Sequence, residues 1–199
     1  MSSKRDKKAT REEILDAAWE LVAEKGAQVG MAEIAAIAGV SRQSVYLHFG
    51  NRGGLLMALL KRTDDRLGIR EAFEAARATP TPAAKLDATL KVWFDFVAEI
   101  LPVARDIIRL RATDKEAEAA WLDRMADLRS WMKLLVSDIS DAGALRPHWQ
   151  VESATDYLWA AASVQAWALL VEDSGWSPAD ASRTLRQSIA DSLLLPPPA

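Results

Sequence analysis

Residues 41–44, Ser-Arg-Gln-Ser, carry side chains that can form hydrogen bonds with the edges of nucleic-acid bases. The guanidinium of Arg42 matches guanine through two donors, the amide of Gln43 matches adenine, and the hydroxyl of Ser44 suits several bases or a phosphate. The run follows directly after a Gly39-Val40 corner, so its side chains can barely avoid facing solvent. It therefore predicts a surface that reads DNA bases.

The elements that must position this run are two short helices on either side of Gly39. In a helix-turn-helix, a small residue lies where the helices cross, a residue that tolerates positive φ makes the turn, and a branched apolar residue locks the second helix. Ala35, Gly39 and Val45 occupy those places. Ser41 is expected to cap the second helix, whose N-terminal end is the one that enters the major groove.

The rest of the chain has helical spacing of apolar residues nearly throughout, with no strand-like alternation and no internal repeat. We therefore expect an all-α protein of about nine helices. The expected parts are a three-helix helix-turn-helix domain over 1–52, a connecting helix with a Pro-containing joint over 53–82, and a C-terminal helical domain over 83–199. A capping box of Thr10 and Glu13 is expected to start the first helix, and Pro102 to stop the helix that follows the joint.

The segment 157–171 is uncharged and apolar nearly all round. Its 15 residues are fewer than the roughly 20 that span a bilayer, so a buried helix is the better interpretation and no membrane association is expected. One side can pack on the chain's own core, and the other needs a partner. We expect a homodimer, because most oligomers are two-fold symmetric, with Trp167, Leu185 and Ile189 in its interface.

Aromatic residues gather in the C-terminal part of the chain, and they predict an apolar cavity for a small molecule. The alternative for each of them is plain core packing. A planar or cationic ligand can stack on such rings, and Asp95, Glu99 or Asp156 would balance a positive charge if turned inward. The candidate lining residues are Trp93, Phe96, Trp121, Met125, Trp131 and Trp159.

Composition argues against catalysis and metal chemistry. The chain has no cysteine, and its two histidines, His48 and His148, lie far apart in the sequence. A zinc site or a Ser-His-acid arrangement therefore has no local support, and we expect no catalytic residue, no metal and no cofactor. The N-terminus has charge but no apolar segment of signal-peptide type, so a cytoplasmic protein is expected.

Two segments, REEILDAAWELVAEKG and EIAAIAGVSRQSVYLHFGNRGGLL, resemble the tetracycline-repressor (TetR) family of bacterial transcriptional regulators. The resemblance rests on the ordered combination of Ile-Ala, Ala-Gly-Val-Ser, Tyr-x-x-Phe and a base at the head of the next helix. It implies that Tyr46, His48 and Arg52 bind operator phosphates, with Arg52 where the family usually has Lys. It also implies a larger C-terminal domain that holds a small-molecule inducer and dimerises through its last two long helices.

Glycines depart from the family's pattern at two places. Gly30 stands where the family usually has a Thr cap on the second helix, and Gly53 and Gly54 replace acidic or small helix formers at the start of the fourth. Gly30 can cap the second helix only at slightly lower stability. Gly53 and Gly54 each cost about 1 kcal/mol relative to Ala if they are fully helical. Alternatively, the missing side chains let exposed N–H groups approach a phosphate.

These features together predict a homodimeric repressor that binds a near-palindromic double-stranded DNA operator and is released by a small apolar or aromatic ligand. An activator of the same fold stays open, because the sign of regulation depends on where the operator lies relative to the promoter. The competing class is a small-molecule-binding or enzymatic helical protein whose DNA-binding module is impaired. Its support is weak, since no catalytic constellation is present while the DNA-facing residues are intact.

Overall fold

The computed structural model describes residues 2–25 and 29–196. Within these ranges every named element is helical, and the only other pairing is an isolated bridge between Leu145 and Leu194. The all-α prediction is confirmed. The chain divides into two compact units, one of Met1–Arg66 with Pro102–Asp123 and one of Leu67–Leu101 with Arg124–Ala199. No helix in the described ranges is long and apolar enough to cross a membrane.

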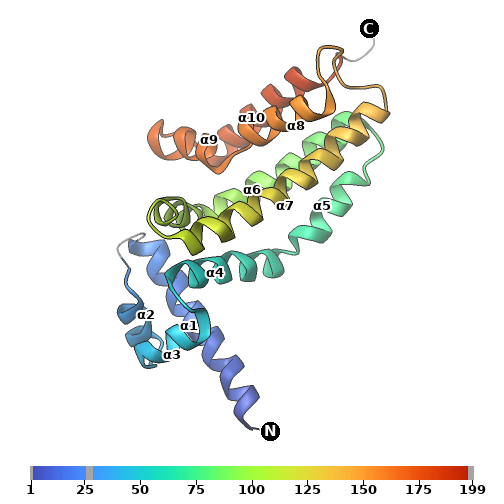
Figure 1. Ribbon diagram of the computed structural model, residues 1–199. Helices are drawn as coiled ribbons and strands as arrows, with labels where there is room; N and C mark the ends of the chain where they lie inside the picture. The colour runs from blue at the N-terminus through green and yellow to red at the C-terminus, as the bar shows by residue number, and fades with distance from the viewer. Residues whose placement is uncertain (1, 26–28, 197–199) are drawn as a thin grey trace. The chain divides into compact units, whose positions relative to one another are not determined.

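The first unit contains four N-terminal helices, of which α2 packs against both α1 and α3 (Figure 1). The helices are α1 (Ser2–Lys25), α2 (Met31–Ile37), α3 (Arg42–Phe49) and α4 (Arg52–Leu67). Buried side chains at helical spacing hold them together, among them Ile14, Leu15, Ala18, Val22, Ile34, Val45, Leu55 and Leu59. Burial of each large apolar side chain contributes roughly 1.5–3 kcal/mol, so this small core is sufficient to fix α3 on its neighbours.

The start of α1 differs from the sequence prediction. The helix begins at Ser2, which leaves Thr10 and Glu13 in its interior. The predicted capping box is therefore wrong, because an N-cap residue must lie outside the helix with its backbone extended. The Lys, Arg and Ala residues that precede Thr10 are good helix formers, and they extend the helix toward the N-terminus.

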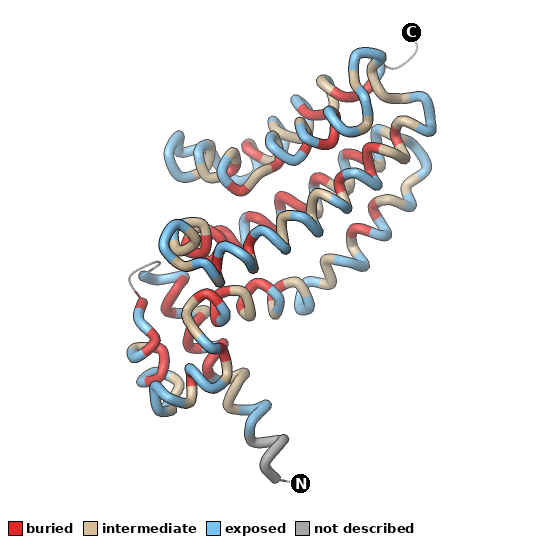
Figure 2. The backbone as a smooth tube through the Cα atoms, in the orientation of Figure 1, coloured by how far each residue is buried: buried red, intermediate tan, exposed pale blue. Residues whose placement is uncertain are grey.

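The second unit is built on the N-terminal part of α6 and the greater part of α7 (Figure 1). Its helices are α5 (Ile69–Arg77), α6 (Pro82–Leu110), α7 (Lys115–Asp141), α8 (Val151–Ala161), α9 (Val164–Ala168), the π-helical turn η2 (Leu169–Asp173) and α10 (Pro178–Leu193). α10 packs against α8 and η2. Buried residues recur along α6 at every turn, which marks this helix as central to the core (Figure 2).

Pro102 lies inside α6 rather than at its end, so the predicted stop is wrong. Proline removes one backbone donor and crowds the preceding turn, which costs roughly 3 kcal/mol in a helix interior. Its neighbours Ile100, Leu101, Val103 and Ala104 are all buried. Packing of both flanks therefore outweighs the local preference, and the helix continues to Leu110.

The apolar segment before Asp173 is broken instead of forming one helix. α8 ends at Ala161, and Ser163 caps α9 by accepting a hydrogen bond from the N–H of Ala166. The break turns Trp167 into the core, where its ring stacks on Phe94 with centroids 5.3 Å apart. The chain's own core thus covers part of this apolar segment, with Leu158, Val164 and Trp167 buried, while Trp159 and Leu169 stay exposed.

Two of the three residues predicted for a dimer interface lie in the chain's own core. Trp167 and Ile189 are each 1% exposed, so neither side chain is available to a second subunit. Leu185, the third predicted residue, is half-buried on α10. The large apolar side chains that stay exposed in this region are Trp159 on α8, Leu169 in η2 and Trp176 just after it.

Candidate nucleic-acid interface and ligand pocket

The corner between α2 and α3 has the geometry that the sequence predicts. Gly39 adopts a φ of 65°, and the chain closes with hydrogen bonds from the N–H of Val40 to the carbonyl of Ala35 (3.0 Å) and from the N–H of Gly39 to that of Ala36 (3.3 Å). This pair of bonds ends α2 as a Schellman motif, for which glycine is the residue without a steric penalty. Ser41 then caps α3, since its Oγ accepts from the N–H of Ser44 at 3.1 Å.

The helix that follows presents a polar outer face. Arg42 and Gln43 are exposed, and Tyr46 is 39% exposed. Nη2 of Arg42 donates to Oη of Tyr46 at 3.2 Å, and the guanidinium carbon lies 5.4 Å from the centre of the tyrosine ring. Residues 42 and 46 are one turn apart, so the two side chains hold each other at the N-terminal end of α3. Gln43 remains directed to solvent beside this pair.

Leu47 also lies on this outer face, and it was missed from the sequence. It is 81% exposed, the highest value among the large apolar side chains described. An exposed leucine is not unusual by itself, but this one lies one helical turn after Gln43. Because Leu47 follows Gln43 by four residues, helical spacing alone could have predicted that it shares the outer face of α3.

Ser44 and His48 are half-buried on the flanks of α3. The imidazole of His48 lies 6.0 Å from the ring of its neighbour Phe49, which is itself buried in the core of the unit. Both side chains therefore lie at the border between the core and the outer face. Their predicted roles toward DNA stay predictions.

Arg52, the predicted phosphate ligand at the head of α4, is held inside the unit. Its guanidinium donates to the carbonyl of Val29 and, at 3.1 Å, to Oδ2 of Asp106 on α6. The arginine side chain is 22% exposed and the aspartate side chain 1%. Burial raises the pKa of Asp106 despite the attraction of Arg52, and Oδ1 has no partner in the described part of the chain. The positive charge of Arg52 thus already faces a buried carboxylate.

The two glycines after Arg52 are required by close contacts. A Cβ on Gly54 would lie 2.1 Å from the carbonyl oxygen of Phe49, and one on Gly53 would lie 2.9 Å from Cβ of Ala117. The N–H of Gly54 donates a hydrogen bond to Oδ1 of Asn51 at 2.8 Å. The side chain of Asn51 therefore caps α4, and the N–H of Gly54 is not free to bind a phosphate. The family's usual residues are therefore excluded here by lack of space.

The second unit contains a small, partly open cavity with a volume of about 20 Å³. The cavity lies among α5, α6, α7 and α8, and two of the predicted pocket residues, Trp93 and Trp131, line it. Its full lining is Phe73, Arg77, Thr89, Leu90, Trp93, Leu128, Trp131, Met132, Leu135 and Leu158. The indole N–H of Trp93 donates to the carbonyl of Ala162 at 2.6 Å, which fixes the ring at the break between α8 and α9.

The other predicted pocket residues lie elsewhere. Phe96 is buried with its ring 5.9 Å from that of Trp93, and Met125 is half-buried on α7. Trp121 belongs to the first unit, where it is 3% exposed. Trp159 is 38% exposed on α8. None of these four is among the residues that line the cavity.

One end of the cavity carries an ion cluster. Arg77 binds Asp138 through Nε at 3.0 Å and through Nη2 at 2.9 Å, and Nζ of Lys85 lies 3.2 Å from the same carboxylate. All three side chains are half-buried. Burial alone would raise the pKa of Asp138, but the hydrogen bonds from Arg77 and Lys85 outweigh it and lower the pKa. Asp138 is therefore ionised at neutral pH.

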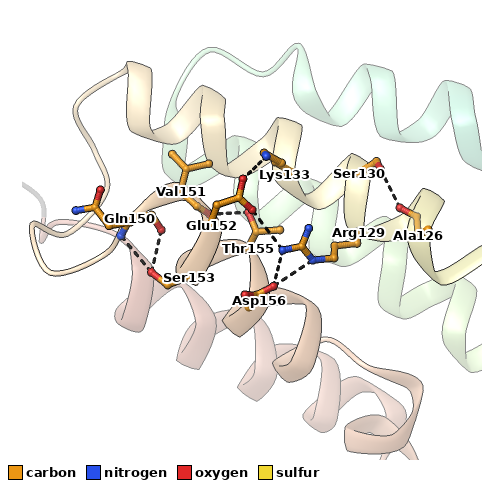
Figure 3. Close-up of polar contacts among 10 residues, drawn as sticks. All are labelled: Ala126, Arg129, Ser130, Lys133, Gln150, Val151, Glu152, Ser153, Thr155 and Asp156. Carbon is orange, nitrogen blue, oxygen red and sulfur yellow. Dashed lines mark hydrogen bonds and ion pairs between the residues drawn. The ribbon is translucent and has the colours of Figure 1, made fainter. Parts of the chain in front are cut away.

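A second ion cluster fastens α8 to α7 on the outer side of the pocket wall (Figure 3). Arg129 binds Asp156 at 2.6 Å and also contacts Glu152, which pairs with Lys133. Hydrogen bonding to Lys133 and Arg129 lowers the pKa of Glu152. Asp156 faces Arg129 and solvent, and Asp95 pairs with exposed Lys91, so neither carboxylate turns toward the cavity as a cation would require.

In the described part of the chain, no group of three or more His, Cys, Asp or Glu residues is placed to hold a metal ion. The fold and these two sites define a class: a helix-turn-helix module joined to a helical unit with a small internal cavity. Residues 14–59 match the model described as bacterial regulatory proteins, tetR family. This helix-turn-helix part of the chain is therefore similar to the tetR family of bacterial regulatory proteins.

Among curated proteins, the chain is similar to the HTH-type transcriptional activator FasR of Mycolicibacterium smegmatis. The two are 38% identical over 90 residues, which are 44% of this chain and 40% of that protein. The aligned part thus spans well under half the length of this relative.

Solved structures share the fold at lower identity. A transcriptional regulator from Saccharomonospora viridis, in complex with choline, is 16% identical with a TM-score of 0.75, and the match covers 95% of this chain and 100% of that one. FadR from Bacillus subtilis, in complex with stearoyl-CoA, is 20% identical with a TM-score of 0.72, and the match covers 91% and 98%. The architecture therefore extends over nearly the whole chain.

Proposed function

We propose that this protein is a sequence-specific DNA-binding transcriptional repressor that a small apolar or aromatic ligand releases from its operator. The observation that carries the proposal is the outer face of α3, where Arg42, Gln43, Tyr46 and Leu47 are exposed on a helix whose N-terminus is capped and whose inner face is buried. Such a helix presents its N-terminal side chains to the major groove.

The side chains on the outer face of α3 differ in the groups of DNA that they can contact. Gln43 is suited to read an adenine, and Leu47 to contact a thymine methyl group. The family resemblance implies that Tyr46 and His48 position the helix on phosphates, with Ser41 and Ser44 beside them. Arg42, held by Tyr46, serves either a guanine or a phosphate. Arg52 can contact a phosphate only if its guanidinium leaves Asp106.

The proposed active form is a homodimer on a near-palindromic site, with two copies of α3 spaced by about 34 Å, one turn of DNA. The apolar side chains exposed in the described part of the second unit include Trp159, Leu169 and Trp176. These residues, rather than buried Trp167 and Ile189, are available for a contact with a second copy. Light scattering of the purified chain measures this directly, and a monomer at the concentration that binds DNA would contradict it.

The test is selection of binding sites from a random duplex pool, followed by affinity measurements on the selected site and a scrambled control over a salt series. A palindromic site bound about 10³-fold or more tightly than the control is expected. Weak, salt-sensitive binding to every sequence would contradict the proposal and favour a small-molecule-binding protein with an impaired DNA-binding module. If the operator lies where the bound protein recruits RNA polymerase instead of blocking it, the protein is an activator.

A further inference from the structure

The N-terminal part of α1 carries a stripe of positive charge. By helical register, Lys4, Lys7, Lys8 and Arg11 fall on one side of α1, since residues three and four apart are neighbours on a helix surface. We call these four residues the basic stripe. Asp6, the acidic residue among them in the sequence, falls on the opposite side of the helix by the same register. Positive charge is therefore concentrated on one side.

The described part of the stripe keeps an excess of positive charge. Lys7 and Lys8 are both exposed, and neither forms an ion pair with another described side chain. Arg11 is half-buried and lies 4.0 Å from one oxygen of Glu12, while Arg62 lies 3.8 Å from the other oxygen. One carboxylate thus faces two arginines, and the two lysines are left to an external anion.

The charges of the stripe repel one another within α1. Like charges four residues apart destabilise a helix, and Lys7 and Arg11 are such a pair, as Lys4 and Lys8 are by their positions. Core packing begins only at Ile14, the first buried residue among the described side chains. Residues 7–9 are exposed one after another, so no other described element covers this part of α1. An anionic partner along this side removes the repulsion.

The stripe begins beside α3, the helix proposed to read DNA bases. The guanidinium carbon of Arg11 lies 5.0 Å from the centre of the ring of Phe49, the last residue of α3. Both residues belong to the same compact unit. Beyond this contact, the N-terminal turns of α1 extend past α3 (Figure 1). The stripe is therefore continuous with the proposed DNA interface and lengthens it along α1.

The length and composition of the segment suit a DNA backbone. From residue 4 to residue 11, α1 advances about 10 Å, and phosphates of one strand follow one another about every 3.4 Å along the duplex axis, so the stripe matches about three phosphates. A membrane surface suits the segment less well. A helix that lies on a membrane needs an apolar face, and residues 2–13 contain no large apolar side chain.

We propose that the basic stripe is a second DNA-contacting surface, which binds backbone phosphates of the duplex whose bases α3 reads. This inference rests on the proposed DNA-binding function and adds a surface outside the helix-turn-helix motif. Phosphate contacts carry no sequence information, so the stripe adds affinity for every duplex while α3 determines the preferred sequence. Lys7 and Lys8 make the largest contribution, because they are exposed and have no ion-pair partner in the described chain.

The test compares the full-length wild type with the double variant Lys7→Gln, Lys8→Gln on two duplexes, the selected site and one of unrelated sequence. Fluorescence anisotropy gives the affinities over a salt series. Each phosphate contact contributes about 0.9 to the slope of log K against log[salt]. The variant is expected to lower this slope by about 2 and the affinity at about 0.1 M salt by about tenfold or more, equally on both duplexes. An unchanged slope, or a loss confined to the selected site, would overturn the proposal.

The double variant Lys61→Gln, Lys91→Gln is the matched control, since it removes the same charge from two lysines that are exposed elsewhere in the chain. Its salt slope is expected to equal that of the wild type. A decrease as large as that of the stripe variant would show that net charge alone sets the slope, and would overturn the assignment. Thermal unfolding is expected to show no loss of stability in the stripe variant, because the substitutions remove like-charge repulsion.

Neutral methylphosphonates, placed one at a time along the selected site, locate the contact. At a phosphate bound by the stripe, this replacement is expected to weaken binding of the wild type but not of the stripe variant. If no position shows this difference, the stripe does not contact the DNA. Vesicles that contain phosphatidylserine test the other anionic surface, and loss of vesicle binding in the variant with DNA binding unchanged would also overturn the proposal.

The unrelated duplex keeps this inference separate from the proposed function, because non-specific binding requires no operator. If no site is selected but the stripe variant still lowers the slope on the unrelated duplex, the sequence-specific regulator is refuted and the phosphate-binding surface is supported. If a palindromic site is selected and the stripe variant binds it with the wild-type slope, the regulator is supported and the surface is refuted.

Discussion

Nη2 of Arg52, at the head of α4, lies 3.1 Å from Oδ2 of Asp106 on α6, and that carboxylate is almost completely buried. The second oxygen, Oδ1, has no hydrogen-bond partner among the described residues. A buried, half-satisfied carboxylate is costly when ionised, because an opposite charge on one side does not replace the lost hydration. This explains why burial raises the pKa of Asp106 even beside an arginine.

A raised pKa makes this pair pH-dependent. Since the pKa of Asp106 in the folded protein lies above its ordinary value of 3.8, its contribution to stability is fully present below that value and is lost as pH rises through the raised pKa. The free energy of unfolding of the wild type, minus that of Asp106→Asn, is therefore expected to decrease as pH rises. Urea unfolding at a series of pH values measures it, and a difference that grows with pH would contradict the argument.

Gly54→Ala is expected to destabilise the protein by about 2–3 kcal/mol, because backbone must move to admit the new Cβ. The Cβ would meet the carbonyl oxygen of Phe49 at 2.1 Å. The control is Gly30→Ser, where nothing lies within 4 Å and the N-cap of α2 makes no side-chain hydrogen bond. Serine there is expected to add roughly a few tenths of a kcal/mol. Thermal unfolding measures the stability of both variants. Equal losses of stability would show that the contact between residue 54 and the carbonyl of Phe49 does not destabilise the variant.

Trp93→Phe is expected to cost about 2 kcal/mol, since it leaves the buried carbonyl of Ala162 without its donor. The indole bond is 2.6 Å long and joins α6 to the end of α8. Trp159→Phe is the matched control, because that tryptophan is 38% exposed and its side chain lies outside the cavity. Chemical unfolding of both variants gives the two free energies. A similar small loss in each would mean that the bond to Ala162 contributes little.

Gln43→Ala and Tyr46→Ala are expected to weaken DNA binding in different ways. Gln43→Ala should relax the preference at one base pair by about 1–3 kcal/mol, as expected for loss of a contact to a base edge. Tyr46→Ala should weaken binding to all sequences alike, because phosphate contacts position the helix without reading bases. Affinities for the selected site and its single-base variants separate the two effects. An equal loss on every sequence for both variants would refute the role of Gln43.

The helix-turn-helix could be predicted from the sequence because its signals are local. Gly39 makes the turn with positive φ, Ser41 caps α3, and Val45 is buried, each as expected from residue type and spacing over a few positions. Turn chemistry, capping and helical periodicity act within one or two turns of chain. The outer position of Arg42 and Gln43 follows from the same pattern.

The cavity and the ion pairs were decided by tertiary structure. Trp93 and Trp131 line the cavity while Trp121 and Trp159 do not, and all four are tryptophans at apolar helical positions. Residue type cannot distinguish them, because which side of each helix faces the cavity depends on how several helices pack together. Likewise, α6 continues past Pro102 because packing of the flanking residues outweighs the tendency of proline to end a helix. The contact of Arg52 with Asp106, 54 residues later, brings together charges that no local pattern relates.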